Sequence, residues 1–294
     1  MRKKRVLFII NPASGPRHNS AEEFTSLVSE FIDTTIFDPH IEITQYARHA
    51  SELSREAVKN KVDVVVAVGG DGTLNEVAGE LINTDTVLGI IPAGSGNGLA
   101  RHLNIPLEMG QAISVINKMQ LLNMDTIKVN NIPYLSIAGI GFDAFVAEKF
   151  AGNTTRGFRT YLNIVSSEYY YYKPQEYKLS IDGNSEKHKA LFISFANSDQ
   201  FGYNTSIAPN ARVDDGLMDI CIVQKIPLYS IPFTAPLLFI KQVHRSTFVN
   251  IIKAKDVIVN TKKSLIVNID GEPVSMKGPL HFSINPHSLN VIIP

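Results

Sequence analysis

Three short glycine-containing turns, each directly after an apolar run, constrain the fold of this 294-residue chain more than any other feature. The turns and the runs before them are, in order, Asn11–Gly15 after Val6–Ile10, Gly69–Thr73 after Val62–Val68, and Pro92–Gly98 after Val87–Ile91. Continuous apolar runs of this length are typical of strands buried on both faces of a parallel sheet. Because the carboxyl ends of parallel strands meet at one edge, we expect the three turns to line one crevice.

Helical periodicity fills the intervals between these strands. Helices are predicted over Ala21–Ile32, His49–Asn60, Leu74–Ile82 and Leu99–Leu103, with a short alternating strand at Ile41–Thr44. An alternation of strand and helix favours an open parallel sheet with right-handed crossovers. The sequence therefore predicts an α/β domain over residues 1–125.

Strand patterns dominate after residue 125. They cover Ile127–Val129, Tyr134–Ile137, Tyr177–Ile181, Lys189–Ala196, Met218–Val223, Asp256–Asn260, Ser264–Asp270 and Leu289–Ile293, with helices only at Phe142–Phe150 and Thr160–Tyr170. Turn signals such as Asp182-Gly183 between the runs are typical of antiparallel sheets or a sandwich. We predict a second, mainly β domain over residues 126–294.

Composition limits the partners and the location. Lys+Arg and Asp+Glu are both 28, so the zero net charge argues against a nucleic-acid partner. The single cysteine, Cys221, lies in an apolar run and is predicted to be a buried strand residue, which fits a reducing, cytoplasmic setting. The apolar run Val6–Ile10 is too short for a signal peptide, and no run reaches the about 18 residues of a membrane span. The predicted location is the cytoplasm, with at most peripheral contact with the membrane.

The glycines of the three turns predict an anion-binding surface. Glycine lets the backbone approach a ligand closely, and the N–H groups exposed at a following helix attract anions. One such turn is weak evidence, whereas three in the same topological position indicate the phosphates of a nucleotide. We therefore expect a phosphoryl-transfer enzyme.

Asp71 lies among these glycines, where an acid would repel phosphate unless a cation lay between them. The position therefore implies Mg²⁺. The alternative is a helix N-cap, a position that aspartate favours. We favour the metal role, and the two roles are compatible.

The residues Gly69–Val77, preceded by Asn11–Gly15 and followed by Pro92–Arg101, resemble the diacylglycerol kinase catalytic domain family. That family includes the soluble bacterial lipid kinases and the sphingosine and ceramide kinases. The resemblance spans nearly the whole chain, since Gly139–Ala144, Asp215–Leu217 and Asp270–Glu272 also follow the family's order. It implies an α/β domain like that of NAD kinase and phosphofructokinase, and an antiparallel β-sandwich domain that binds lipid and completes the active-site cleft.

The resemblance also implies roles for individual residues. ATP contacts are expected at Asn11, Pro12, Ser14, Gly15, Thr44, Gly70, Asp71, Gly72, Thr73, Leu74, Asn75, Glu76, Ser95 and Asn97. A structural metal site is expected from the carboxylate of Asp215 and the main-chain carbonyls of Arg212 and Leu217; an ordinary Asp-Gly turn is the alternative there. Glu272 corresponds to the general base of the bacterial relatives, whereas Asp71 corresponds to the proposed base of the sphingosine and ceramide kinases.

The expected reaction is transfer of the γ-phosphate of ATP to the hydroxyl of diacylglycerol or a related lipid. One departure concerns Gly98, which stands where the bacterial diacylglycerol kinases usually carry an acid, and which favours the sphingosine or ceramide type as the alternative. NAD kinase and a non-catalytic nucleotide- or lipid-binding protein follow as further alternatives.

The expected partners are a lipid substrate at the membrane surface and a second copy of the chain in a homodimer. Tyr169–Tyr172 and Ile226–Ile240 could offer apolar surface to the lipid, although we favour core packing for both.

Overall fold

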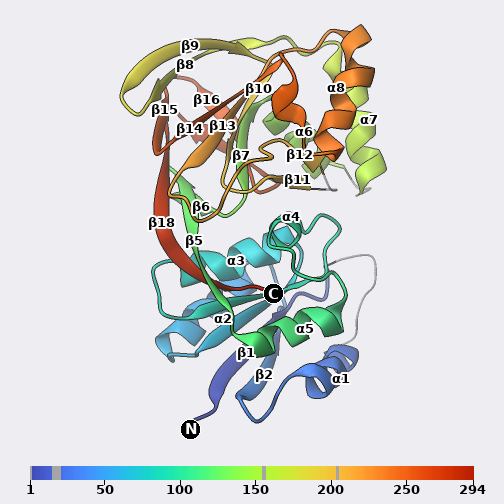
Figure 1. Cartoon of the computed structure of the whole chain (residues 1–294), viewed down its shortest axis with the longest axis vertical. Coiled ribbons are helices and arrows are strands. Elements are labelled where there is room, and N and C mark those ends of the chain that lie inside the picture. Colours follow the sequence, from blue (N-terminus) through green and yellow to red (C-terminus); the bar gives the residue numbers. More distant parts are fainter. Residues whose placement is uncertain (1, 15–20, 154–156, 203–204) are drawn as a thin grey trace. The chain divides into compact units, whose positions relative to one another are not determined.

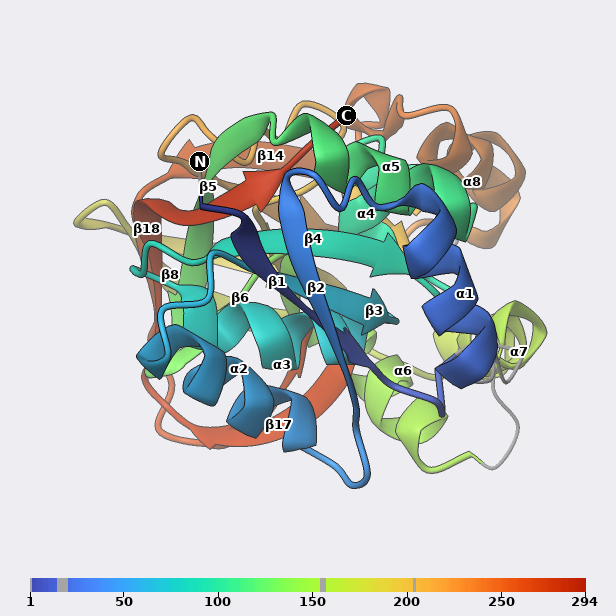
Figure 2. The same ribbon diagram turned by 90° about the horizontal axis from the view of Figure 1, so that it is seen from below.

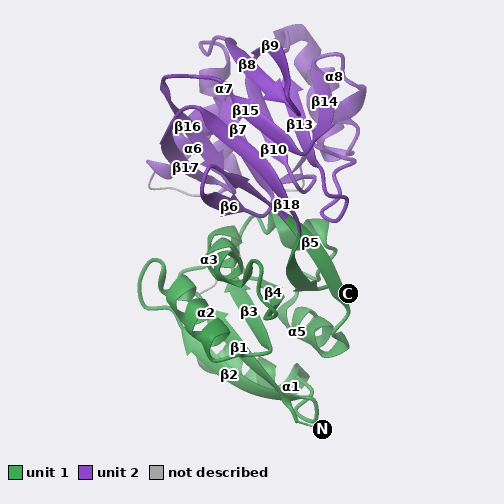
Figure 3. Cartoon of the chain, turned by 90° about the vertical axis from the view of Figure 1, so that its left-hand side faces the viewer, with its two compact units in different colours: residues 1–125, 287–294 green, residues 126–286 purple. Residues whose placement is uncertain are grey.

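The computed structural model describes residues 2–14, 21–153, 157–202 and 205–294. The chain divides into two compact units (Figure 3): unit 1 comprises residues 1–125 and 287–294, and unit 2 comprises residues 126–286. Residues 287–294, which the sequence analysis assigned to the second domain, thus belong to the first unit. The reason is the long strand β18 (Leu280–Ile292), whose last part pairs with unit 1 at Val291 and Leu88.

Unit 1 contains a parallel sheet of strand order β2-β1-β3-β4. The strands are β1 (Lys4–Ile10), β2 (Phe37–Ile43), β3 (Val64–Gly69) and β4 (Val87–Pro92). Every residue of β3 and β4 is buried, as their continuous apolar runs predict for strands covered on both faces. The α/β fold predicted for this part of the chain is confirmed.

Helices cover both faces of this sheet (Figure 2). They are α1 (Ala21–Phe31), α2 (His49–Lys59), α3 (Asp71–Leu81), α4 (Gly98–His102) and α5 (Met109–Lys118). Helix α1 packs against α5 on one face, and α2 packs against α3 on the other. The sequence analysis missed α5, which begins after Glu108, whose carboxylate accepts hydrogen bonds from the N–H groups of Gly110 and Gln111 at 2.8 Å.

Unit 2 is built from two antiparallel sheets (Figure 1). The first has the order β14-β13-β10-β7-β16-β17, and the second contains the first part of β18 with β15, β8 and β9. Their strands are β7 (Ile137–Gly141), β8 (Gln175–Ile181), β9 (Asn184–Ala190), β10 (Phe192–Ala196), β13 (Met218–Val223), β14 (Val249–Ala254), β15 (Asp256–Val259), β16 (Ser264–Ile269) and β17 (Glu272–Lys277). The two sheets share one apolar core, in which the rings of Phe195 and Phe282 stack at 3.7 Å. The predicted β-sandwich is confirmed.

The remaining strands and α-helices are β5 (Leu121–Val129), β6 (Ile132–Tyr134), β11 (Gln200–Gly202), β12 (Thr205–Ser206), α6 (Phe142–Ala151), α7 (Phe158–Tyr169) and α8 (Ile231–Phe239). No helix within the described ranges is both long and apolar enough to cross a membrane. Cys221 is buried in β13, as predicted, and burial raises the pKa of its thiol.

Two predicted strands are split in the structure. The predicted strand Tyr134–Ile137 is divided between the end of β6 and the start of β7. The N–H groups of Leu135, Ser136 and Ile137 donate to the carboxylate of Asp270 at this point. Lys189–Ala196 separates at Leu191, where the chain passes from one sheet, through β9, to the other, through β10. Strands β14 and β17 and helix α8 were not predicted.

Candidate functional site

The second and third glycine turns are in backbone contact at the carboxyl edge of the unit 1 sheet. The N–H of Ala93 donates to the carbonyl of Gly69 at 2.8 Å. A Cβ placed on Gly94 would lie 2.5 Å from the Cα of Gly70, closer than any side chain tolerates. The two turns can therefore approach this closely only because residue 94 is glycine.

The first turn is linked to the second by side chains. Asn11 Nδ2 donates to Thr73 Oγ1 at 2.9 Å, and Ser14 Oγ accepts from the N–H of Gly70 at 3.4 Å. Asn11 also accepts from the N–H of Ala13 through its Oδ1 at 2.9 Å, which fixes the turn locally. The three turns thus lie together, as the sequence analysis expected, whereas Gly15 lies outside the described residues.

Asp71 joins the second turn to the third. It is the first residue of α3, and its two carboxylate oxygens accept from the N–H groups of Asn97 at 3.0 Å and Gly98 at 2.9 Å. The N-cap of α3 is Gly70, and no side chain caps that helix, so the N-cap alternative for Asp71 is wrong. Burial raises the pKa of Asp71, although the two N–H donors and the charge of Arg101 oppose that shift.

The third turn is also stabilised by hydrogen bonds between its own residues. Asn97 is buried and has a φ of 51°; its Oδ1 accepts from the N–H of Gly94, and its Nδ2 donates to the carbonyl of Gly94. Gly98 contacts Asp71 through its backbone alone. The contact with Asp71 therefore does not depend on the side chain at position 98.

The other residues expected to contact ATP differ in their exposure and in the hydrogen bonds that they already make. Thr44 lies beside the first turn, since its N–H donates to the carbonyl of Ile10 at 2.8 Å. Pro12, Gly72 and Ser95 are exposed, and Asn75 is half-buried. Leu74 is buried in the core, so only its backbone could meet a ligand. Glu76 Oε1 accepts from the N–H of Arg48 at 3.2 Å.

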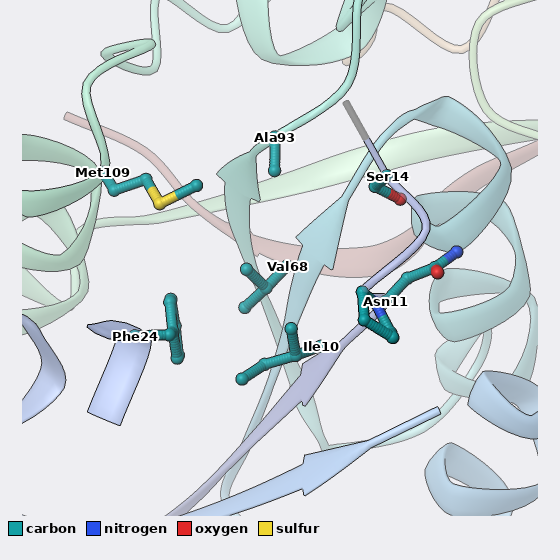
Figure 4. A pocket seen from close by; sticks show the side chains of 8 residues that line it. Ile10, Asn11, Ser14, Phe24, Val68, Ala93 and Met109 are labelled. Carbon is teal, nitrogen blue, oxygen red and sulfur yellow. The ribbon is translucent and has the colours of Figure 1, made fainter. Parts of the chain in front are cut away.

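A pocket lies beside the first turn in unit 1 (Figure 4). Its polar side carries Asn11 and Ser14, and its apolar side carries Ile10, Phe24, Val68 and Met109; Pro12 and Ala93 complete it. Sequence reasoning treated Phe24 only as part of a helical apolar face and did not single out Met109. Nothing in a single sequence distinguishes a pocket-lining apolar residue from a core residue.

In unit 2, the candidate base Glu272 follows a tight hairpin turn. Asp270 and Gly271, with φ values of 46° and 95°, form a two-residue connection between the paired residues Ile269 and Glu272. Glu272 is the first residue of β17 and is exposed. Its carboxylate is therefore open to a partner, while its backbone is held by the sheet.

A buried acid that sequence reasoning missed lies next to this hairpin. Asp143, in the first turn of α6, is 6% exposed, and its Oδ2 accepts from Asn268 Nδ2 at 3.0 Å. Burial raises the pKa of Asp143 to about 6, and the hydrogen bond from Asn268 opposes that shift. The run Gly139–Ala144 was noted only as part of the family pattern, without a role for this carboxylate.

The residues expected to hold a structural metal are close to a lysine. Asp215 Oδ1 accepts from the N–H of Leu217 at 3.1 Å, and Asp215 Oδ2 lies 2.7 Å from the ammonium of Lys253. The same ammonium lies 3.4 Å from the buried carboxyl of Asp219. Burial raises the pKa of Asp219, and the charge of Lys253 opposes that shift. Asp215 keeps free lone pairs for a hard cation, but Lys253 already compensates its charge. No group of three or more His, Cys, Asp or Glu side chains that could hold a metal occurs in the described part of the chain.

An α/β unit with three glycine turns at one edge of its parallel sheet, followed by a β-sandwich unit, is typical of a class of nucleotide-dependent kinases. Comparison with known proteins agrees with this class. Residues 5–129 match the diacylglycerol kinase catalytic domain family, and residues 136–293 match the YegS C-terminal NAD kinase beta sandwich-like domain family. The chain therefore belongs to the lipid kinase family that joins these two domains, which confirms the resemblance and the enzyme class, an ATP-dependent lipid kinase.

Individual relatives are similar over nearly their whole length. The chain is 27% identical to a diacylglycerol kinase of Bacillus subtilis (strain 168), covering 99% of this chain and 97% of the relative. It is 26% identical to a diacylglycerol kinase of Staphylococcus aureus (strain MRSA252), covering 99% and 93%. The crystal structure of a putative diacylglycerol kinase from Bacillus anthracis str. Sterne has a TM-score of 0.79 at 25% identity, covering 100% of this chain and 98% of that one.

The buried carboxyl of Asp143 predicts a pH-dependent stability. Because its pKa is about 6 in the folded protein and 3.8 in the reference state, the folded state holds this proton more tightly than the unfolded chain. The free energy of unfolding should therefore fall by up to about 3 kcal/mol from this group as the pH rises from 4 through 6. Urea denaturation of wild type and Asp143→Asn at several pH values measures the free energy of unfolding of each. The contributions of the other titratable groups cancel when the two values are subtracted. Parallel stability curves for the two proteins would contradict the expectation.

Proposed function

We propose that this protein transfers the γ-phosphate of ATP to the hydroxyl of diacylglycerol or a closely related lipid. The observation that supports this function most strongly is the array of three turns at one sheet edge, in which Asp71 joins the second turn to the third and Asn11 and Ser14 join the first to the second. The family membership and the relatives named diacylglycerol kinase support the choice of acceptor.

The hydrogen bonds within the turns narrow the place where phosphate can bind. The N–H groups of Gly94, Asn97 and Gly98 already donate to side chains. The first N–H groups of a helix have no acceptor within it, and at the start of α3 these belong to Gly72 and Thr73. We therefore assign the phosphates to the start of α3, with Ser14 and Asn11 beside them.

The carboxylate of Asp71 would bind Mg²⁺ together with phosphate oxygens, since a carboxylate has more lone pairs than the backbone N–H groups that donate to Asp71. Mg²⁺ bound there would neutralise charge on the transferred phosphoryl group.

Glu272 would act as the general base. It would take the proton of the acceptor hydroxyl while that oxygen bonds to the γ-phosphorus, and the bond from the γ-phosphorus to the bridging oxygen would break to release ADP. Asp71 is the alternative base. Against it, both of its carboxylate oxygens already accept backbone hydrogen bonds, whereas Glu272 is exposed.

Phosphate transfer from radiolabelled ATP tests the reaction. Wild type should label diacylglycerol in the presence of Mg²⁺, and Glu272→Gln should lower kcat by roughly 10²- to 10⁴-fold, the usual contribution of a general base. Glu176→Gln, an exposed acid on β8, is the matched control and should behave as wild type. Asp71→Asn should raise the Mg²⁺ requirement if Asp71 binds the metal, and should lower kcat at saturating Mg²⁺ if it is the base.

The acceptor is identified in the same assay by offering diacylglycerol, ceramide, sphingosine and NAD separately. Preferred labelling of a sphingoid lipid would favour the alternative that Gly98 suggests, and labelled NADP would indicate an NAD kinase. An absence of any labelled product would reject the proposed function in favour of a binding protein.

A structural cation at Asp215 is the second metal proposal, with the carbonyls of Arg212 and Leu217 as its other ligands. If it binds, EDTA should lower the melting temperature of wild type by several degrees, since a ligand at a hundred times its Kd stabilises by about 2.7 kcal/mol. The EDTA effect should disappear in Asp215→Asn and persist in Asp214→Asn, whose carboxylate pairs with Arg212 instead. A melting temperature insensitive to EDTA would mean that Lys253 alone compensates Asp215.

Peripheral membrane contact is supported by an exposed apolar surface of unit 2, formed by the residues of Tyr169–Tyr172 and Ile226–Ile240 that do not pack in the core. Tyr169, Tyr172, Leu237 and Leu238 do pack inward. Other apolar residues of the same segments are exposed to solvent. The five with the largest exposed fractions, 58–79%, are Tyr170, Tyr171, Leu228, Tyr229 and Phe233. Hydrogen bonds between Tyr169 and Ile226 hold the two segments together. Helix α8, on the outside of unit 2 (Figure 1), contains no charged residue.

We assign this surface, defined by those five exposed residues, to the membrane interface, where aromatic side chains with polar tips are favoured. Burying one such side chain is worth about 1.5–3 kcal/mol, so Leu228→Ser/Phe233→Ser should weaken binding to diacylglycerol-containing vesicles by at least roughly tenfold. Cosedimentation measures this, with Leu121→Ser, an exposed leucine of unit 1, as the control. Activity on a short-chain, water-soluble diacylglycerol should stay unchanged; equal vesicle binding by the double variant would reject the assignment.

A homodimer stays a prediction, for which sedimentation velocity is the measurement.

A further inference from the structure

The side chain of Asn268 lies between the buried Asp143 and the turn that precedes Glu272. Its Nδ2 donates to Asp143 Oδ2 at 3.0 Å, and its Oδ1 accepts from the N–H of Gly271 at 3.0 Å. A carboxylate can only accept and an N–H can only donate, so the two contacts fix the orientation of the amide. Rotating the amide by 180° would place like groups against each other at both ends.

The backbone next to Asp143 is shaped to admit its carboxylate. Gly139 on β7 pairs with Asn268 on β16, and a Cβ on Gly139 would overlap Asp143 Oδ2. The missing side chain at position 139 thus leaves the space in which the carboxylate meets the amide. Asp143 is buried and has no counter-ion among its described contacts, so its hydrogen bond to Asn268 is its main stabilising interaction.

The hairpin turn is held from both sides. Asp270 accepts from the N–H groups of Leu135, Ser136 and Ile137 at 2.8–3.0 Å, which attaches one half of the turn to the segment between β6 and β7. Gly271, the other half, is attached only through Asn268 among the contacts that the structure describes. Glu272 itself pairs with Ile269 in the sheet, and the turn immediately before it is fixed on the Gly271 side by the Asp143–Asn268 pair.

We propose that Asp143 and Asn268 are positioning residues that hold the Gly271 turn, and with it the carboxylate of Glu272, in the geometry for proton abstraction. This inference depends on the proposed function, in which Glu272 is the general base. An exposed carboxylate on a glycine turn has many accessible orientations, and fixing its backbone removes part of that freedom. A displacement of about 1 Å at a catalytic group can cost on the order of 100-fold in rate.

Exchanging the two side chains gives the sharpest test. In Asn268→Asp, two carboxylates face each other at pH 8, and kcat should fall by roughly 10- to 100-fold with the KM for ATP unchanged. In Asp143→Asn/Asn268→Asp, the new amide donates to the new carboxylate, which still accepts from Gly271. This double variant should recover most of the wild-type kcat. Circular dichroism under the assay conditions measures the folded fraction of each variant, so that a loss of folded protein is not counted as a loss in kcat.

A double-mutant cycle with Glu272→Gln tests whether the effect passes through the base. Asn268→Ala should lower kcat in the wild-type background and have little further effect in the Glu272→Gln background. Hydrogen exchange of the Gly271 amide gives a readout that does not need activity, and exchange should accelerate in Asn268→Ala. Asn250→Ala, an exposed asparagine on β14, is the matched control for both measurements.

The outcomes separate this inference from the proposed function. If wild type labels no acceptor, the proposed reaction is wrong. If Glu272→Gln is as fast as wild type, Glu272 is not the base. In either case the positioning role is also wrong. If Glu272→Gln is slow but Asn268→Asp is as fast as wild type, the positioning role alone is wrong. The positioning role is also wrong if the losses in kcat from Asn268→Ala and Glu272→Gln multiply fully, or if Gly271 exchanges at the wild-type rate in Asn268→Ala.

Discussion

The two hydrogen bonds from Asn97 and Gly98 to the carboxylate of Asp71 join the second and third glycine turns, on which the proposed nucleotide site depends. Glycine turns are adaptable, and three of them at one sheet edge would sample many arrangements without a fixed link. Asp71 supplies that link between the second and third turns from the first turn of α3, beside the close approach of Gly70 to Gly94. Asn11 and Ser14 add the link to the first turn.

The sequence predicts strands of unit 1 well because burial on both faces leaves an unbroken apolar run. Strands β3 and β4 were predicted within two residues at each end for this reason. Prediction from the sequence fails where tertiary contacts override the local pattern. Helix α8 contains two prolines, one in its first turn and Pro236 in its interior, yet Leu237 and Leu238 anchor it to the sandwich. Strand β17 is mostly exposed and forms only because a two-residue turn returns it to β16.

The candidate site was predictable to the same extent, and for the same reason. The glycine turns carry a local signature, so their meeting followed from the topology of a parallel sheet. The contacts of single side chains did not follow. Asp71 was expected to cap its own helix or bind metal, and it binds the backbone of a turn 26 and 27 residues further on. Asn268 lies 125 residues from Asp143, and no local pattern in either segment indicates the pair.

Both units use side-chain oxygens to fix backbone N–H groups of a turn, Asp71 and Asn97 in unit 1 and Asp270 and Asn268 in unit 2. Each such bond removes an N–H from the set that could bind a ligand. In unit 1 the first N–H groups of α3 stay outside these bonds, and they are the proposed donors to phosphate. In unit 2 the bonds leave the carboxylate of Glu272 exposed while its backbone is held. In both units these bonds fix the backbone and leave another group free: the first N–H groups of α3 in unit 1 and the carboxylate of Glu272 in unit 2, the two groups that the proposed reaction requires.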